Sequence, residues 1–388
     1  MKLMGYQREN GTYGIRNHLL IIPASVCAVE VSNRIAQKVT GAVSLPHQHG
    51  CCQMGADFRQ TIRTLTGFGC NPNVGAVLVV GLGCEGIQPS QVAEEIKKTG
   101  KPVEFITIQA CGGTTKTVTQ GIIIAEKFAK ILSSANRVPF PISHLTLGME
   151  CGGSDPTSGI VANPGIGIAS DRLVSLGGSS ILSETTEVIG AEHILAERFP
   201  DAEERGKFLT MVSNVEKRAL AVGEDLRGSQ PTPGNIQGGL STIEEKSLGC
   251  MHKAGHSAPF MGALEYGQAV PPAKLGLYFM DTPGEDIDSI TGMVAGGAQL
   301  IVFTTGRGTP TGCPIAPVIK ITGNPQTFQT MEENIDINGG KVIQGECTLD
   351  DLGEEIFKKM ISVANGEQTK AEKLGHKEFG IYRIGFTF

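Results

Sequence analysis

The sequence lacks the charge pattern of a protein that binds nucleic acid or an anionic membrane surface. It has no run of Lys or Arg, and its 33 basic against 39 acidic residues give a formal net charge of −6 at pH 7. A chain without a basic patch has no electrostatic attraction for polyanions. We therefore expect a small molecule as its partner, with no nucleic acid and no membrane.

Long apolar runs and a leader sequence are also missing. No apolar stretch approaches the roughly 20 residues that span a bilayer, and the N-terminal segment lacks the residue order of a signal peptide. The expected location is therefore cytoplasmic. Thiols stay reduced there, so the ten cysteines are expected to be buried hydrophobes, metal ligands or reactive groups rather than disulfides.

No Cys-x-x-Cys pair occurs, which disfavours a zinc ribbon or a thioredoxin-like dithiol. A metal site assembled from distant loops stays open. Several cysteines have a glycine within one residue and fall in expected loops: Cys51, Cys84, Cys111, Cys151 and Cys250. Together with His and carboxylate side chains, such cysteines suit Fe(II) or Zn(II).

Apolar runs alternate with helical patterns along the chain, which indicates an α/β fold. "LLIIPASV", "AVSL", "AVLVVGLG" and "PVEFITIQ" predict a parallel, Rossmann-like sheet in an N-terminal domain, residues 1–138. The polar segment 133–143, with two prolines, predicts a domain boundary. A larger, less regular α/β domain is expected over residues 144–388, with strands such as "HLTLGME" and "AQLIVFTTG". Near its end, Thr348 and Asp351 predict a capping box.

Parallel sheets bind ligands at the carboxyl ends of their strands. The loops "PHQHGCC", "GLGCEG" and "QACGGTTKT" follow three expected strands, so we expect them to meet at one crevice. In the first of them, "LPHQHGCCQMG" (45–55), the histidines and cysteines fit a metal cluster, a nucleophile with its base, or a polar turn. The local sequence leaves these alternatives open.

The motif "GLGCEG" has the Gly-x-Gly-x-x-Gly spacing of a dinucleotide-binding turn, between a strand and a helix. That fingerprint also needs an acidic residue at the end of the next strand, whereas Glu104 lies near the start of "PVEFITIQ" and the strand is expected to end at Gln109. A nicotinamide-dependent oxidoreductase is therefore a distant alternative, as is a cysteine hydrolase.

Many long motifs in order resemble the altronate and galactarate dehydratase family over residues 5–388. They include "GYQRENGTYGIRNHLLIIP", "GGTTKT", "ECGGSDPTSGIVANP", "LSETTEVIGAEHIL", "PTPGNIQGGLSTIEEKSLGC" and "MDTPGEDIDSITGMVAGGAQLIVFTTGRGTP". The resemblance also extends to the large subunit of sulfolactate sulfo-lyase. It implies a lyase that removes water, or sulfite, from the β-carbon of a 2-hydroxy acid.

The resemblance further implies a divalent metal, usually Fe(II), with Mn(II) as an alternative and an iron-sulfur cluster left open. Family members carry a small additional domain or a separate small chain, so we expect a small partner subunit; a homo-oligomer is also open. Altronate, giving a 2-keto-3-deoxy acid, is the first substrate expected, and sulfolactate is the alternative.

Elimination from a hydroxy acid needs a base for the proton beside the carboxylate and a cation that stabilises the developing enolate. Residues of the right type to hold the metal are His47, Cys51, Cys84, Glu85, Cys151, Glu184 and Cys250. The expected base is His49, His252 or Lys246, in that order. Expected substrate contacts are Lys116, Arg307, Thr114 and Asp155, with Arg307 favoured as a fork for a carboxylate.

Overall fold

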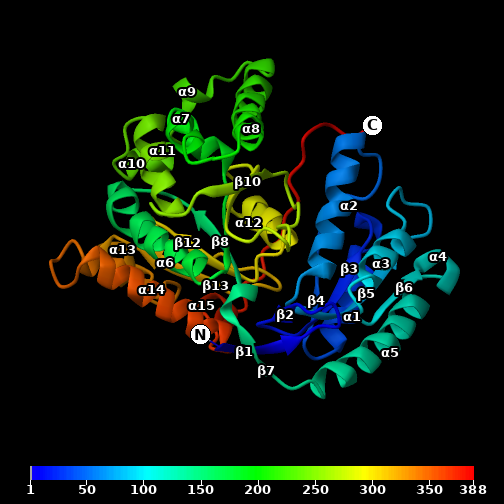
Figure 1. Cartoon of the computed structure of the whole chain (residues 1–388). Helices are drawn as coiled ribbons and strands as arrows, with labels where there is room; N and C mark the ends of the chain where they lie inside the picture. The colour runs from blue at the N-terminus through cyan, green and yellow to red at the C-terminus, as the bar shows by residue number, and fades with distance from the viewer. Residues whose placement is uncertain (1) are drawn as a thin grey trace.

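The computed structural model describes residues 2–388 and has two α/β domains, each built on a parallel sheet (Figure 1). In the first domain the sheet has four strands in the order β4-β3-β5-β6. Its strands are β3 (His18–Pro23), β4 (Ala42–Ser44), β5 (Val74–Gly81) and β6 (Val103–Thr107). Its helices are α1 (Val29–Lys38), α2 (Gly55–Cys70), α3 (Pro89–Lys97), α4 (Ile108–Cys111) and α5 (Thr114–Ser133).

Helices cover both faces of this first sheet, as the continuous apolar runs predict. Every residue of β5 is buried. Leu78 and Val80 pack with α1 and α5, whereas Val77 and Val79 pack with α2 and α3. Strand β6 ends at Thr107, two residues before the expected end, because α4 begins at Ile108.

A small antiparallel sheet in the order β2-β1-β7 lies where the two domains join. Its strands are β1 (Lys2–Gln7), β2 (Tyr13–Gly14) and β7 (Val138–Pro141). Strand β7 lies within the segment 133–143, which was expected to be a plain connection. It pairs with β1, Leu3 opposite Phe140, and its prolines are tolerated because it is an edge strand.

The second domain is more regular than expected, because one parallel sheet of seven strands runs through it in the order β10-β11-β9-β8-β12-β13-β14. The strands are β8 (Thr146–Cys151), β9 (Ser179–Leu182), β10 (Phe260–Leu264), β11 (Leu277–Met280), β12 (Leu300–Thr304), β13 (Val318–Thr322) and β14 (Ile337–Asn338). The helices are α6 (Asn163–Ser175), α7 (Glu192–Ala196), α8 (Ala202–Ala221), α9 (Leu226–Ser229), α10 (Pro233–Gln237), α11 (Ile243–Met251), α12 (Asp286–Ala295), α13 (Pro325–Thr330), α14 (Leu349–Ala364) and α15 (Lys370–Leu374). The expected capping box of Thr348 and Asp351 opens α14.

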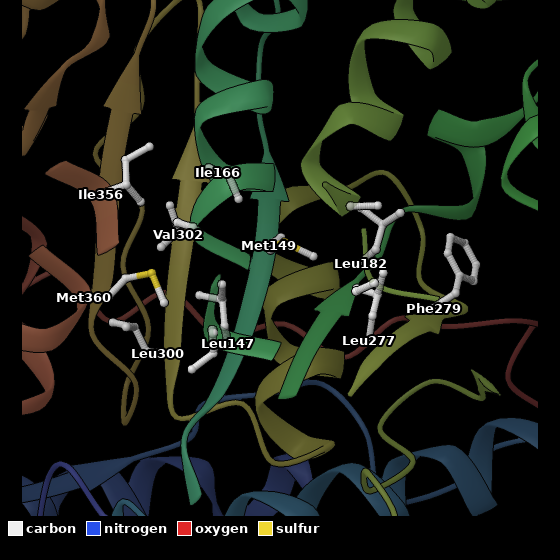
Figure 2. Close-up of a cluster of buried hydrophobic side chains, with 14 of the residues drawn as sticks. Leu147, Met149, Ile166, Leu182, Leu277, Phe279, Leu300, Val302, Ile356 and Met360 are labelled. Carbon is white, nitrogen blue, oxygen red and sulfur yellow. The ribbon is translucent and has the colours of Figure 1, made fainter. Parts of the chain in front are cut away.

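Side chains alternate between the two faces of this seven-stranded sheet. Leu147 and Met149 of β8 point to the face that α6 and α14 cover, where they meet Ile166 and Met360 (Figure 2). Because successive residues of a strand point to opposite faces, Glu150 lies on the face of α12 and Cys151 on the face of α6. The end of β8 therefore presents a carboxylate on one face and a thiol on the other.

The domains share a hydrophobic cluster and a C-terminal strap. Leu65 and Phe68 of α2 pack in one cluster with Met293 and Val294 of α12. The chain end, drawn in red, then crosses from the second domain to α2 (Figure 1), where the Asp57 carboxylate accepts hydrogen bonds from the backbone N–H groups at positions 384 and 385 at 2.6 and 2.8 Å. Within residues 2–388 no helix combines the length and the apolar character needed to cross a membrane.

Candidate active site

The strand order creates a crevice at the carboxyl edge of the seven-stranded sheet. The chain leaves β8 toward β9 on one side, whereas it leaves β12 toward β13 on the other, so the loops after β8 and β12 diverge. Such a point is where parallel sheets bind ligands. Backbone hydrogen bonds fix the two loops, Gly152 N–H to Thr304 O at 3.0 Å and Gly306 N–H to Gly153 O at 2.8 Å.

A buried cluster of thiols, carboxylates and ammonium groups lies at this edge, on the face of α6. The Cys151 thiol donates to Glu187 Oε2 at 2.7 Å and lies 3.5 Å from Cys250 Sγ. Lys253 Nζ, fully buried, is 2.9 Å from Cys151 Sγ, 3.1 Å from Glu187 Oε2 and 2.7 Å from Glu184 Oε2. The ammonium group thus occupies the centre of these acidic groups.

Lys246 adds a second ammonium group, with Nζ 2.6 Å from Glu187 Oε1. Burial acts to raise the pKa of Glu187, but the charges of Lys246 and Lys253 outweigh it and hold that pKa below its usual range. Burial acts to lower the pKa of Lys246, but the negative charge of Glu187 outweighs burial and raises that pKa above its usual range. Burial also raises the pKa of the Cys151 thiol well above its usual value. The ground state is therefore ammonium, carboxylate and neutral thiol.

Glu184 links this cluster to the opposite face of the sheet. Its φ of +70° lies in the left-handed region, which is rare for a residue with a side chain. Glu184 Oε2 accepts from Lys253 and from the backbone N–H of Cys151, whereas Oε1 is buried and accepts nothing among residues 2–388. Burial, and then the charge of Glu187, raise its pKa to about 7.

Glu150 and Asp286 complete a second acidic group on the face of α12. Carboxylate oxygens of Glu150, Glu184 and Asp286 all lie within 4.8 Å of one another. Glu150 Oε2 accepts from Ser289 Oγ at 2.6 Å, while Oε1 has no partner among the described residues. Burial, then the Glu184 charge, raise the pKa of Glu150 well above its usual range and that of Asp286 to about 8.

A pocket of about 250 Å³ opens beside the thiol cluster. Its walls include Lys246, Cys250 and His252 from α11 and the turn that follows it, with Ser154 and Asp155 from the loop after β8. His252 is half-buried and has no side-chain hydrogen bond among residues 2–388. Burial and the neighbouring His256 lower its pKa, so the ring is neutral.

The structure places the expected substrate contacts Asp155 and Arg307 at this same edge. Asp155 is buried and fully hydrogen-bonded: Oδ1 accepts from Thr157 Oγ1 at 2.6 Å and Oδ2 from Asn324 Nδ2 at 2.8 Å. It thus holds the loops after β8 and β13 together. Arg307 is exposed, and Nη2 donates to Gln237 Oε1 at 3.2 Å, so most of its guanidinium is free for an anion.

His47 and His49 lie elsewhere, in a pocket of about 590 Å³ between the first domain and the C-terminal strap. His47 uses both ring nitrogens, Nε2 with Pro23 O at 2.7 Å and Nδ1 with the His49 backbone N–H at 3.1 Å. Burial lowers its pKa to about 4. His49 Nε2 contacts Ile381 O at 2.9 Å, and burial lowers its pKa too. Asp288 of α12 lines this pocket as well.

The three loops of the first domain contact one another, but of the three only the first lines the pocket of His47 and His49. The N–H of Ile87 donates to Gly50 O at 3.2 Å, and Gln109 Nε2 lies 3.5 Å from Cys84 Sγ. Cys51 and Cys84 are exposed. They belong to neither of the two groups of three or more close ligand atoms, Cys151–Glu187–Cys250 and Glu150–Glu184–Asp286, found within residues 2–388.

Glu85 is used within its own turn. Its two carboxylate oxygens accept from the backbone N–H groups of Leu82 and Gly83 at 2.9 and 2.5 Å. These are amides that a dinucleotide-binding turn would offer to a pyrophosphate. The buried carboxylate thus explains "GLGCEG" as a tight, self-capped turn.

Lys116 and Thr114 lie in the first turn of α5, exposed at the carboxyl edge of the four-stranded sheet. The residues expected to form one site therefore divide between the two domains. Cys151, Glu184, Lys246 and Cys250 come together in one cluster, with His252 and Asp155 on the adjoining pocket.

Four residues of the site were missed from the sequence: Glu150, Glu187, Lys253 and Asp286. Helical spacing indicates two of them, Lys253 and Glu187. Lys253 lies three residues after Cys250, which lies four residues after Lys246, and Glu187 lies three residues after Glu184. Glu150 directly precedes Cys151 and reads as strand. Only the fold brings Asp286 to it.

Comparison with known proteins adds the family. Residues 142–387 match the model described as D-galactarate/Altronate dehydratase, C-terminal, and residues 5–133 match D-galactarate dehydratase/Altronate hydrolase, second domain. The chain belongs to this family. This match confirms the resemblance of its sequence motifs to the altronate and galactarate dehydratases.

The relatives that this chain resembles are named as a sulfo-lyase or as dehydratases. The (2R)-sulfolactate sulfo-lyase subunit beta of Chromohalobacter salexigens is 38% identical over 98% of this chain and 97% of its own. The altronate dehydratases of Bacillus subtilis and Escherichia coli are each 34% identical, over 99% and 98% of this chain and 78% of their own lengths.

Proposed function

We propose that this protein is the large subunit of a metal-dependent lyase that eliminates water from a sugar acid such as altronate, giving a 2-keto-3-deoxy acid. The observation that carries the proposal is the family match over both domains, with relatives named as dehydratases. The pocket beside the buried ammonium groups is the site that we assign to the reaction.

His252 suits the base among the three candidates. It lines the pocket, it is neutral, and its ring nitrogens are free to take the proton next to the substrate carboxylate. Lys246 is held as an ammonium ion by Glu187, so it suits the stabilisation of negative charge on the substrate rather than proton abstraction. His49 lies in the other pocket and bonds to the strap.

Glu150 and Glu184, which do not line this pocket, suit a divalent cation, since one buried carboxylate oxygen of each has no hydrogen-bond partner among the described residues. When bound, the cation would supply Lewis-acid stabilisation of the enolate that forms as the proton leaves. The thiol pair suits it less well, because the Lys253 ammonium already lies 2.9 Å from Cys151 Sγ. Iron or manganese remains the proposed metal, and a cytoplasmic location remains a prediction.

Sulfite elimination from sulfolactate is the second candidate. It is favoured by sequence identity, which is 38% to the sulfo-lyase subunit and 34% to each altronate dehydratase. Both reactions remove a proton and expel a group from the neighbouring carbon, so the same pocket serves either. The relative's designation as a subunit also supports a separate small partner chain.

The test is turnover of a panel of aldonates, aldarates and sulfolactate by the chain with any partner that co-purifies with it, under anaerobic Fe(II) or Mn(II). We expect a 2-keto acid without any change in nicotinamide absorbance. His252→Gln should lower kcat by roughly 100-fold or more. The matched control, His256→Gln, changes an exposed ring next to it and should retain turnover. Equal activity of the two variants would contradict the assignment of the base.

A further inference from the structure

We infer that Cys51 and Cys52, in the loop after β4, form a vicinal dithiol that hydrogen peroxide oxidises reversibly to a disulfide. The two residues follow one another in the chain, and their Sγ atoms lie 3.8 Å apart. Both side chains are exposed, so an oxidant in solvent reaches them. The pair belongs to neither group of close ligand atoms found within residues 2–388, and the proposed lyase reaction does not use it.

An unusual backbone conformation brings the two thiols to the same side of the loop. In an extended segment, successive side chains point to opposite faces, which would separate the two sulfur atoms. Cys52 instead adopts φ +52°, in the left-handed region that residues with a side chain rarely occupy. The end of the C-terminal strap, which lies beside α2 (Figure 1), holds this conformation: Cys52 O accepts from the Phe388 N–H at 3.2 Å, and Gln53 forms an antiparallel bridge with Thr387.

Exposure distinguishes this pair from the other pair of thiols that lie in contact. Cys151 Sγ and Cys250 Sγ are 3.5 Å apart, but both residues are buried, and burial raises the pKa of the Cys151 thiol well above its usual value. The thiolate is the form that reacts with oxidants, so the buried pair is inert. Cys84 is exposed as well, but its Sγ contacts Gln109 Nε2 at 3.5 Å rather than a second thiol.

The oxidation takes two balanced steps. One thiol of the pair, as its thiolate, attacks hydrogen peroxide; the O–O bond breaks, and a sulfenic acid forms while the other oxygen leaves as water. The neighbouring thiol then attacks the sulfenic sulfur, so that the S–S bond forms, the S–O bond breaks and a second water leaves. The two sulfurs together lose two electrons, and one peroxide is reduced to two water molecules.

The resulting disulfide is strained and is therefore easily reduced. Consecutive Cα atoms lie about 3.8 Å apart, below the roughly 4.4–6.8 Å that disulfides usually span. Strained, exposed disulfides have higher reduction potentials than structural ones, so a thiol such as glutathione opens this one again.

Closure of the disulfide also disturbs the strap. The two sulfurs must approach from 3.8 Å to about 2.05 Å, which requires the chain at Cys52 to rotate. The Cys52 carbonyl is the acceptor for the Phe388 N–H, so this rotation weakens the attachment of the strap to the loop. The strap and the same loop both line the pocket of His47 and His49, so oxidation changes the wall of that pocket.

The test is mass spectrometry of the full chain after exposure to hydrogen peroxide, in a buffer whose chelator keeps free iron from decomposing the peroxide. Residues 39–59 form one tryptic peptide, whose only cysteines are Cys51 and Cys52. We expect this peptide to lose two hydrogens, about 2 Da, and to resist alkylation until glutathione restores both thiols. Hydrogen exchange at the amides of Ile384 and Gly385 should accelerate roughly fivefold or more on oxidation and should return to its first value on reduction.

Serine variants separate the pair from single reactive thiols. Cys51→Ser and Cys52→Ser should each prevent the loss of two hydrogens and leave a sulfenic acid or a glutathione adduct on the remaining thiol. Both positions are exposed, so both variants should keep the Tm of the unchanged protein. The matched control Cys84→Ser, at an exposed cysteine of a neighbouring loop, should form the Cys51–Cys52 disulfide like the unchanged protein.

The inference is overturned if peroxide leaves both thiols open to alkylation, or if Cys51 is recovered linked to the peptide that carries Cys84. It is also overturned if the pair passes to a sulfinic acid that glutathione does not reduce. Unchanged exchange at Ile384 and Gly385 in the oxidised protein would refute the link to the strap. None of these measurements involves turnover, so they stand or fall separately from the proposed lyase function.

Discussion

Removing the buried ammonium group of Lys253 tests how the cluster is held together. Lys253→Met replaces the side chain by an apolar one of similar length. It leaves Glu184 Oε2 without the partner at 2.7 Å and Glu187 Oε2 without the partner at 3.1 Å, in a place where water does not reach. Breaking a buried ion pair from one side costs roughly 3–5 kcal/mol. For a domain of this size the Tm should fall by roughly 6–20 °C.

Calorimetry of the full chain at neutral pH measures this change, and a surface lysine provides the control. Lys358 pairs with Glu354 at 3.6 Å and its side chain is 72% exposed, so Lys358→Met should cost less than about 1 kcal/mol. The double variant Lys253→Met/Glu184→Gln should recover part of the loss, because it removes an unpaired charge. Equal Tm values for Lys253→Met and Lys358→Met would refute the buried ion network.

Two further predictions concern the first domain and the strap. The pKa of His47 in the folded protein is about 4, below the ordinary 6.5, so between these pH values only the unfolded chain takes up the proton and up to about 3 kcal/mol of stability is lost as the pH falls. The variant His47→Gln should therefore show a smaller change in its urea midpoint between pH 7.5 and 4.5. An unchanged slope would contradict the assignment. Asp57→Ala removes the acceptor of the Ile384 and Gly385 N–H groups, so hydrogen exchange at these two amides should accelerate roughly tenfold or more. The control Asp201→Ala, at a distant helix cap, should leave their exchange unchanged. Protection retained in Asp57→Ala would show that other contacts hold the strap.

Much of the fold follows from local patterns in the sequence. The buried strands β3, β5, β8 and β12 are continuous apolar runs, and the Thr348 capping box opens α14 as expected. Strand β7 contains two prolines, and β14 has two residues. The existence of β7 depends on pairing with β1, which is distant in the sequence, and that of β14 on pairing with β13 across helix α13, so no pattern within either strand indicates it.

The site was also predictable only in part, since local motifs indicate some of its residues and the fold alone brings in the others. Cys151 and Cys250 stand out because glycine flanks them, and Lys246 because it lies in the same motif as Cys250. Glu150 and Lys253 sit among apolar neighbours and resemble ordinary strand and helix residues. Their role arises from parallel pairing, which brings the ends of β8 and β9 together and leaves the first domain's His47 and Cys51 in another place.

The most direct test of the lyase assignment is the product of turnover in D₂O, analysed by nuclear magnetic resonance. Elimination removes the proton at C2 and the leaving group at C3, and the resulting enol takes one proton from solvent at C3. We predict a 2-keto-3-deoxy acid, or pyruvate from sulfolactate, with one deuterium at C3 and no consumption of nicotinamide. A product that retains its C3 substituent and appears with a stoichiometric change in nicotinamide would contradict it.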